Sequence, residues 1–174
     1  HPQIPNNSYG IVITRLLYSP IDSTLIVFST NTWTLNTHYI TQLNLETGEL
    51  ISATTIRTSL QIQTLTIKDD FLYIPYSSGV ANPTNDPISL KKYNLRTHQM
   101  EWDFTSALNT NRAVYLSKIE IDSNSNIYCT GAIRQNSDYR GTWYVAKISP
   151  EGELLYTKSM YNSVPNDSRL SQGL

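Results

Sequence analysis

Short runs of alternating apolar and polar residues fill the chain, and tight polar turns separate them. In "YITQLNL" (residues 39–45) every second residue is apolar or Thr, and in "KIEID" the two Ile residues share one face. Such alternation predicts β-strands with one buried face. Because no stretch sustains a helical period, we expect an all-β fold.

The same order of predicted elements occurs three times: strand, tight turn, strand, variable insert, strand, tight turn, strand. The units run from "ITRLLYSPIDSTLIVFST" to "HYITQLNLETGELISATTI", from "IQTLTIKDDFLYIPYSSG" to "ISLKKYNLRTHQMEWDF", and from "LSKIEIDSNSNIYCTGAI" to "TWYVAKISPEGELLYTKSM". We place them near residues 10–58, 59–107 and 113–161, between a polar leader (1–9) and a polar tail (162–174). Four short antiparallel strands repeating every ~50 residues are typical of propeller blades. The sequence therefore predicts three four-stranded antiparallel propeller blades.

Turn residues support this repeat. The segments "ETGE", "RTHQ" and "PEGE" place Gly48, His98 and Gly152 at matching positions. Glycine there suits a backbone that needs a positive φ, and His98 is the odd member of the set. The earlier turns, "PIDS", "KDD" and "DSNSN", hold residues that accept local backbone hydrogen bonds. The second strands repeat in the same register, anchored on Leu25, Leu72 and Ile127.

The third unit carries a more specific pattern, "DSNSNIYCTG" followed after a loop by "VAKISPEGELLY". It resembles the β-propeller repeat described as SBBP-like, with the pattern D-x-x-G-N-I-Y-V-T-G, a variable loop, and V-A-K-hydrophobic-x-P-D-G-x-L-L-W. Ser125, Cys129, Glu151 and Tyr156 stand where that pattern has Gly, an aliphatic residue, Asp and Trp. The resemblance covers residues 120–158 and implies a propeller blade. The first two units share only the blade skeleton.

Three blades make an incomplete propeller. A closed ring needs at least four blades, and a repeat buries its apolar faces only against its neighbours. We therefore expect the first and third blades to be covered by further propeller sequence or by other protein subunits.

Composition narrows the function classes. Charged residues make up only 16% and the net charge is -1, whereas Thr, Ser and Asn occur 20, 19 and 15 times. This net charge offers no basic surface of the kind that binds nucleic acid, and no apolar run is long enough for membrane insertion. A lone cysteine, Cys129, excludes an intrachain disulfide and a Cys-based zinc site. Together with the sequons at Asn6 ("NNS") and Asn166 ("NDS"), candidates for N-glycosylation, the polar composition favours an extracellular or cell-surface location.

No residues assemble into a catalytic or metal-binding pattern. The three histidines (His1, His38 and His98) lack ligand spacing, and we interpret them as solvated loop residues. The segment "DSNSN" lacks the Gly and the closing Glu of a calcium loop, so a tight turn explains it better. Cys129 lies in mid-strand and is predicted to be a buried core thiol. We therefore predict no catalytic residue, no metal and no cofactor, and hence a protein that is not an enzyme.

Aromatic residues near the inserts are the remaining candidates for ligand or glycan contact, because aromatic faces among polar residues hold sugars and proline-rich partners. They are Trp33, Tyr39, Tyr139 and Trp143. Tyr39 and Trp143 begin predicted strands, so packing between blades is the alternative for them.

These observations favour a non-catalytic extracellular interaction or structural module, built from propeller repeats and contacting other protein chains in an assembly. One alternative is a carbohydrate-binding lectin-type propeller, for which glycans would be the partners. The other is a fragment of a quinoprotein-like enzyme, since "HQMEWDF", with a Trp near the end of the second unit, resembles the quinoprotein-type repeat, whose blades often end in Trp.

Overall fold

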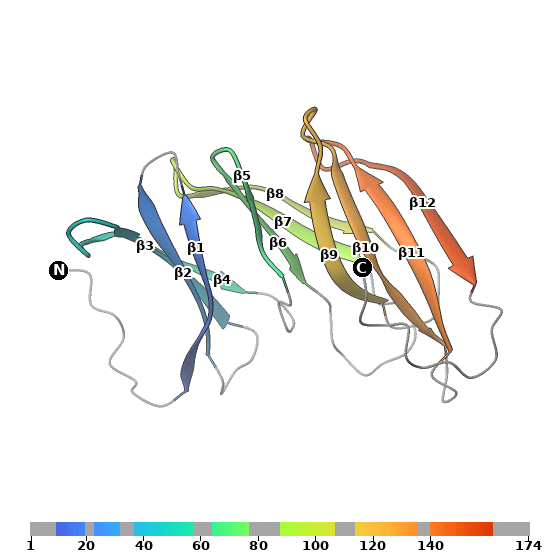
Figure 1. Cartoon of the computed structure of the whole chain (residues 1–174), viewed down its shortest axis with the longest axis horizontal. Helices are drawn as coiled ribbons and strands as arrows, with labels where there is room; N and C mark the ends of the chain where they lie inside the picture. Colours follow the sequence, from blue (N-terminus) through green and yellow to red (C-terminus); the bar gives the residue numbers. More distant parts are fainter. Residues whose placement is uncertain are drawn as a thin grey trace.

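Three β-sheets of four strands each follow one another along the molecule in the computed structural model (Figure 1). The structure describes residues 10–19, 23–31, 37–57, 64–76, 88–106, 114–135 and 140–161. The predicted leader and tail lie outside these ranges. No helix long and apolar enough to cross a membrane occurs within them.

All three sheets are antiparallel meanders, in which the strands pair in chain order. The first contains β1 (Ile11–Ser19), β2 (Thr24–Asn31), β3 (Thr37–Asn44) and β4 (Leu50–Arg57). The second contains β5 (Thr66–Lys68), β6 (Phe71–Tyr76), β7 (Ile88–Asn94) and β8 (Gln99–Ser106). The third contains β9 (Val114–Ile121), β10 (Ile127–Gln135), β11 (Arg140–Ile148) and β12 (Leu154–Tyr161). The prediction of an all-β fold with three four-stranded antiparallel blades is confirmed.

One polar side chain shapes the turn between the third and fourth strands of each sheet. The Oδ1 atom of Asn44 accepts hydrogen bonds from the backbone N–H groups two and three residues later, at 2.9 and 3.0 Å. Asn94 makes the same pair of bonds at the same distances. In the third sheet, the Oγ atom of Ser149 replaces the amide oxygen and accepts from two backbone N–H groups, each at 3.2 Å. Asn44, Asn94 and Ser149 therefore mark equivalent positions.

The same turns contain the residues expected to need a positive φ. Gly48 and Gly152 have φ values of 70° and 89°, and His98 adopts φ 59° at the matching position. Side chains rarely adopt this left-handed region, so His98 occupies it at a cost that glycine avoids. A positive φ is thus common to all three turns, although only two of them supply a glycine. The third turn is one residue shorter, because Gly152 follows Ser149 by three residues, whereas Gly48 and His98 follow Asn44 and Asn94 by four.

Strand pairing relates the sheets residue by residue. The turn residues Asn44 and Asn94 pair with Thr24 and Phe71, and Ile148, just before Ser149, pairs with Ile127. By this register, Leu25, Leu72 and Ile127 are equivalent, as predicted. We call the face of each sheet that carries this residue its leading face, and the opposite face its trailing face.

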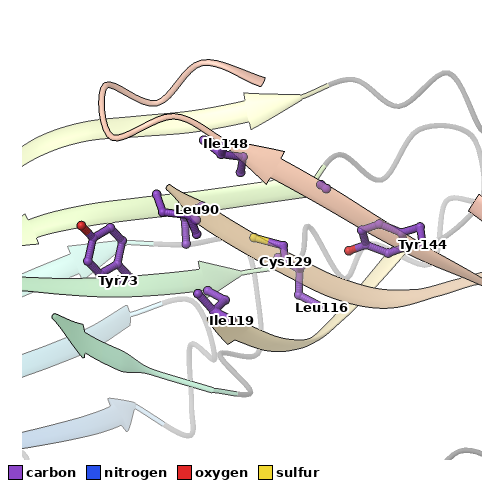
Figure 2. Close-up of a cluster of buried hydrophobic side chains, with 9 residues drawn as sticks. Tyr73, Leu90, Leu116, Ile119, Cys129, Tyr144 and Ile148 are labelled. Carbon is purple, nitrogen blue, oxygen red and sulfur yellow. The ribbon is translucent and has the colours of Figure 1, made fainter. Parts of the chain in front are cut away.

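Two hydrophobic clusters join the sheets. The first lies between the trailing face of the first sheet and the leading face of the second, and contains Ile26, Phe28, Ile40, Ile56, Leu65, Leu72, Ile74, Tyr93 and Leu95. In the second cluster, Tyr73 and Leu90 of the second sheet meet the leading face of the third, with Leu116, Ile119, Cys129, Tyr144 and Ile148 (Figure 2). Full burial of one such side chain contributes about 1.5–3 kcal/mol, so these clusters hold the sheets together. Both interfaces join a trailing face to a leading face.

Candidate interaction surfaces

Exposed apolar side chains cover the leading face of the first sheet. Pairing with Ser29, Val27 and Leu25 places Ile13, Leu16 and Tyr18 of β1 on this face, and they are 61%, 59% and 53% exposed. None of the described sheets packs against it, since this sheet ends the row (Figure 1). Edge strand β1 thus presents large apolar groups that folded monomers normally bury.

Leu45 extends this surface into the turn that follows β3. It is 50% exposed, whereas Leu95, which follows Asn94 as Leu45 follows Asn44, is only 3% exposed. The neighbouring trailing face covers Leu95, and no described sheet covers Leu45. The two leucines therefore differ in surroundings and not in sequence context.

At the other end of the row, the trailing face of the third sheet is also uncovered. Its residues Trp143 and Tyr156 are exposed, and Val145 between them is half-buried. The Lys147 ammonium lies 5.1 Å from the centroid of the Tyr128 ring, and a hydrogen bond with Tyr128 raises the pKa of this lysine. The surface is therefore aromatic and cationic, whereas the described residues of the face at the opposite end make no lysine contact of this kind and combine the aliphatic Ile13 and Leu16 with Tyr18.

A polar contact repeats at both inner interfaces. The Nε2 atom of Gln42 donates to the carbonyl oxygen of Leu95 at 2.9 Å, between the first and second sheets. The Nζ atom of Lys92 donates to the carbonyl oxygen of Pro150 at 3.1 Å, between the second and third. Gln42 and Lys92 both lie two residues before the turn residue of their own sheet. Leu95 and Pro150 both lie one residue after the turn residue of the next sheet, so the contact is one repeated feature.

A second contact to the same carbonyl group, that of Pro150, involves Trp102. Its indole N–H donates to the Pro150 carbonyl at 3.0 Å, and the ring covers Gly152. A Cβ atom on Gly152 would lie 3.1 Å from Cδ2 of this ring. Gly152 is therefore required both for its positive φ and for the close approach of the tryptophan.

Sequence reasoning noted Trp102 only through the likeness of "HQMEWDF" to quinoprotein-type blades, and it did not single out Gln42 or Lys92. The signal that could have found them is their position, because Gln42, Lys92 and Lys147 each lie two residues before the turn residue of their unit. At each of these positions a long donor side chain interrupts the face of a strand, and for Gln42 and Lys92 it reaches the next sheet.

Only two of the predicted ligand-contact residues lie in the described part of the chain. Tyr39 lies in β3 on the leading face of the first sheet, half-buried. Trp143 lies in β11 on the trailing face of the third sheet. The second sheet separates them, so the structure does not bring them together. Trp33, Tyr139 and the sequons at Asn6 and Asn166 lie outside the described residues.

The acidic segment "DSNSN" is a closed turn. The Asp122 carboxylate accepts from the backbone N–H groups of Asn124 and Asn126, each at 2.9 Å, and from the Asn126 side chain and the Tyr128 hydroxyl. These bonds, the Asn126 side chain first, hold the pKa of Asp122 below its usual value. The carboxylate oxygens are used within the turn, which agrees with the interpretation as a tight turn.

Burial dominates the chemistry of the lone cysteine. Cys129 is fully buried in the second cluster (Figure 2), and burial raises the pKa of its thiol to about 12. Burial likewise raises the pKa of the neighbouring Tyr144 far above its usual value. The thiolate is the nucleophilic form of cysteine, so Cys129 is suited to packing and not to catalysis.

The prediction of solvated histidines is wrong for His38. This residue lies inside β3 on the trailing face of the first sheet, where it is buried beneath the second sheet. Its ring stacks on Phe28 with centroids 5.5 Å apart, and Nδ1 lies 3.0 Å from the Thr30 hydroxyl. Burial lowers the pKa of His38. His98 is exposed in its turn as predicted, and His1 lies outside the described residues.

Similarity to known proteins is found among solved structures. No protein-family model matches the chain, and no curated protein matches it. The resemblance of the third unit to the SBBP-like repeat therefore stays a prediction. Among solved structures, the chain is similar to BamB from Moraxella catarrhalis, with 15% sequence identity and a TM-score of 0.34. The similarity covers 92% of this chain and 54% of that one, so the chain spans about half the length of that protein.

Proposed function

We propose that this chain is a non-catalytic interaction or structural module, which contacts other protein chains through the uncovered faces at its two ends. The observation that carries the proposal is the exposure of Ile13, Leu16 and Tyr18 on one face of the first sheet. Soluble monomers seldom expose contiguous apolar patches larger than roughly 300–600 Å², and larger patches mark interaction sites. Burial of this face by a protein partner removes the apolar surface from water.

The non-catalytic role is supported by the state of the reactive groups in the described residues. Cys129 is buried with a raised pKa, and the Asp122 carboxylate is occupied within its own turn. His38 is buried beside Phe28 and Thr30. Each of these groups serves packing or turn formation, which supports the proposal of a non-catalytic role.

An extracellular or cell-surface location is part of the proposal. It is supported by the low share of charged residues, the abundance of Ser, Thr and Asn, and the sequons at Asn6 and Asn166. Intact-mass measurement of the native protein tests it, because glycosylation at either asparagine would add the mass of a glycan.

The lectin alternative would need aromatic side chains at equivalent places in successive blades. Tyr39 is equivalent to the buried Tyr144, and Trp143 is equivalent to the buried His38. The two candidate aromatic residues in the described part of the chain are thus not equivalent to each other, and their arrangement does not support this alternative. No contact of the described residues favours the quinoprotein alternative either.

The interaction role is tested in the native source of the protein. Leu16→Lys places a charge on the apolar face, and we expect it to reduce the size of the native complex that contains the chain, measured by size-exclusion chromatography of a gentle extract. Ile51→Lys is the matched control, because Glu101 holds the equivalent place in the covered second sheet and stays exposed there. A complex of unchanged size in the Leu16→Lys variant would contradict the proposal.

A further inference from the structure

We propose that a second copy of this chain covers the leading face of the first sheet with the trailing face of its own third sheet. This inference rests on the proposed function and names the partner. Both interfaces inside the chain join a trailing face to a leading face. The one trailing face and the one leading face that no described sheet covers lie at opposite ends of the row (Figure 1), so they do not meet within one copy, whereas two copies can bring them together.

Lys147 specifies the register of this pairing. It lies two residues before Ser149, as Gln42 and Lys92 lie two residues before Asn44 and Asn94. Both of those side chains donate to the carbonyl that follows the turn residue of the next sheet. In the first sheet that carbonyl belongs to Leu45. We therefore expect Lys147 of one copy to donate to the Leu45 carbonyl of the other.

Tyr156 and Gly48 form the second matched pair. Lys147 pairs with Tyr156 as Lys92 pairs with Trp102, so the tyrosine holds the position of the tryptophan that covers Gly152. Gly48 is the positive-φ glycine of the corresponding turn in the first sheet, one residue farther from its turn residue than Gly152 is. A Cβ atom placed on Gly48 would meet no heavy atom of the described residues within 4 Å. The space that Trp102 fills over Gly152 is thus open over Gly48, and exposed Tyr156 is the aromatic residue placed to fill it.

The apolar residues of the two uncovered faces support the same pairing as the polar contact of Lys147. Val145, half-buried on the trailing face of the third sheet, is equivalent to Ile40 and Leu90, which are fully buried in the two inner interfaces. Opposite them, the leading face of the first sheet offers Ile13 and Leu16. A neighbour of the same kind would bury these groups as the inner interfaces do.

The stoichiometry also fits a closed assembly. Contacts that join unlike faces form a ring when the rotation closes. Two copies supply six sheets, twice the three in the described part of one chain, and closed propellers contain about 4–8 blades. We therefore expect a dimer in which the same contact occurs twice.

Size-exclusion chromatography with light scattering on the purified full chain tests the pairing. We expect the wild type at twice the chain mass of 19.8 kDa. Leu16→Lys blocks the leading face and Tyr156→Glu blocks the trailing face, so each variant alone should stay at the chain mass. Mixed in equal amounts, the two variants retain one intact pair of unlike faces and should again give a species of twice the mass. Ile51→Lys should dimerise like the wild type.

Two variants of Lys147 examine the contact itself. Lys147→Gln should retain the dimer, because Gln42 makes the same bond in the first interface. Lys147→Ala should weaken the dimer about 30-fold, because the variant loses this hydrogen bond, worth roughly 1 kcal/mol, at both contacts of the dimer. Equal dissociation constants for the wild type and Lys147→Ala would overturn this register.

Three outcomes would overturn the self-pairing. They are a wild type that stays at the chain mass at tens of micromolar, a Tyr156→Glu variant that still dimerises alone, and a mixture that stays at the chain mass. Far-ultraviolet circular dichroism of each variant shows whether it is folded, and both substituted side chains are exposed. A monomeric wild type whose native complex still depends on Leu16 would overturn self-pairing and leave the interaction role standing. A monomeric wild type, together with a native complex that keeps its size in the Leu16→Lys variant, would overturn both proposals.

Discussion

The leading faces of the first and third sheets carry matching residues in opposite surroundings. Ile13 and Leu16 are 61% and 59% exposed, whereas Leu116 and Ile119, which pair with Gly131 and Cys129 at the equivalent positions, are 6% and 3% exposed. Both pairs lie in the first strand of their sheet and both are aliphatic. The difference lies in the neighbour, because the second sheet covers only the latter face. Apolar patterning therefore marks a face that can be covered, and the adjacent sheet decides whether it is.

Alanine substitution at one repeated position should show the largest difference. Leu72 is fully buried between the first two sheets, so Leu72→Ala should lower the free energy of unfolding by about 2–5 kcal/mol. Leu25 is the half-buried equivalent of Leu72, and Leu25→Ala should lower the free energy of unfolding by about 1 kcal/mol or less when the protein is monomeric. Urea denaturation measures both values. If a second copy covers the face, the cost of Leu25→Ala should rise with protein concentration. Equal costs at every concentration would remove the distinction between the two faces.

The two turn glycines should differ in the same way. Gly152→Ala forces a side chain into a left-handed backbone and against the Trp102 ring, and should cost about 2 kcal/mol or more. Gly48→Ala carries only the backbone strain, about 1 kcal/mol. Thermal unfolding of the two variants compares them. If Gly48→Ala lowers the Tm more than Gly152→Ala in dilute solution, the space around Gly48 is not open.

Acidification should weaken the covered trailing face of the first sheet. Burial lowers the pKa of His38 from 6.5, so the unfolded chain binds this proton more readily than the folded chain. The contribution of neutral His38 is present above pH 6.5 and is lost as the pH falls from there through the lower pKa of the folded state. We expect His38→Gln to flatten this part of the stability profile, measured by denaturation between pH 7.5 and about pH 5. An unchanged slope would mean that His38 is not the titrating group.

The smallest effect should come from His98. Its φ of 59° costs energy that glycine avoids, although glycine also loses more chain entropy on folding. His98→Gly should therefore stabilise the protein by about 0.5 kcal/mol, detectable as a small rise in Tm. Destabilisation would mean that the His98 side chain contributes a contact of its own.

Local structure was predictable because it depends on neighbours in sequence. The turn at Gly48, His98 and Gly152 follows from spacing and backbone preference, and the strands follow from alternation. The error at His38 arose from placing the start of β3 too late, since the strand begins at Thr37 and alternation then directs this residue towards the second sheet.

The contacts between sheets were beyond prediction because they join distant residues. The bond from Gln42 to Leu95 spans 53 residues, and the bond from Lys92 to Pro150 spans 58. A glutamine or lysine in a strand is compatible with solvent as well as with such a bond. Only the packing of one sheet against the next decides between these two environments.

Because the four strands of every sheet are consecutive in the chain, each sheet can complete its hydrogen-bonded ladder before the next one is synthesised. During translation, all four strands of the first sheet have been synthesised once the chain reaches Arg57, and those of the second sheet once it reaches Ser106. Folding can therefore proceed from the N-terminus onward as translation continues. The same arrangement makes a whole sheet the natural unit of gene duplication or deletion, since adding or removing one cuts no ladder.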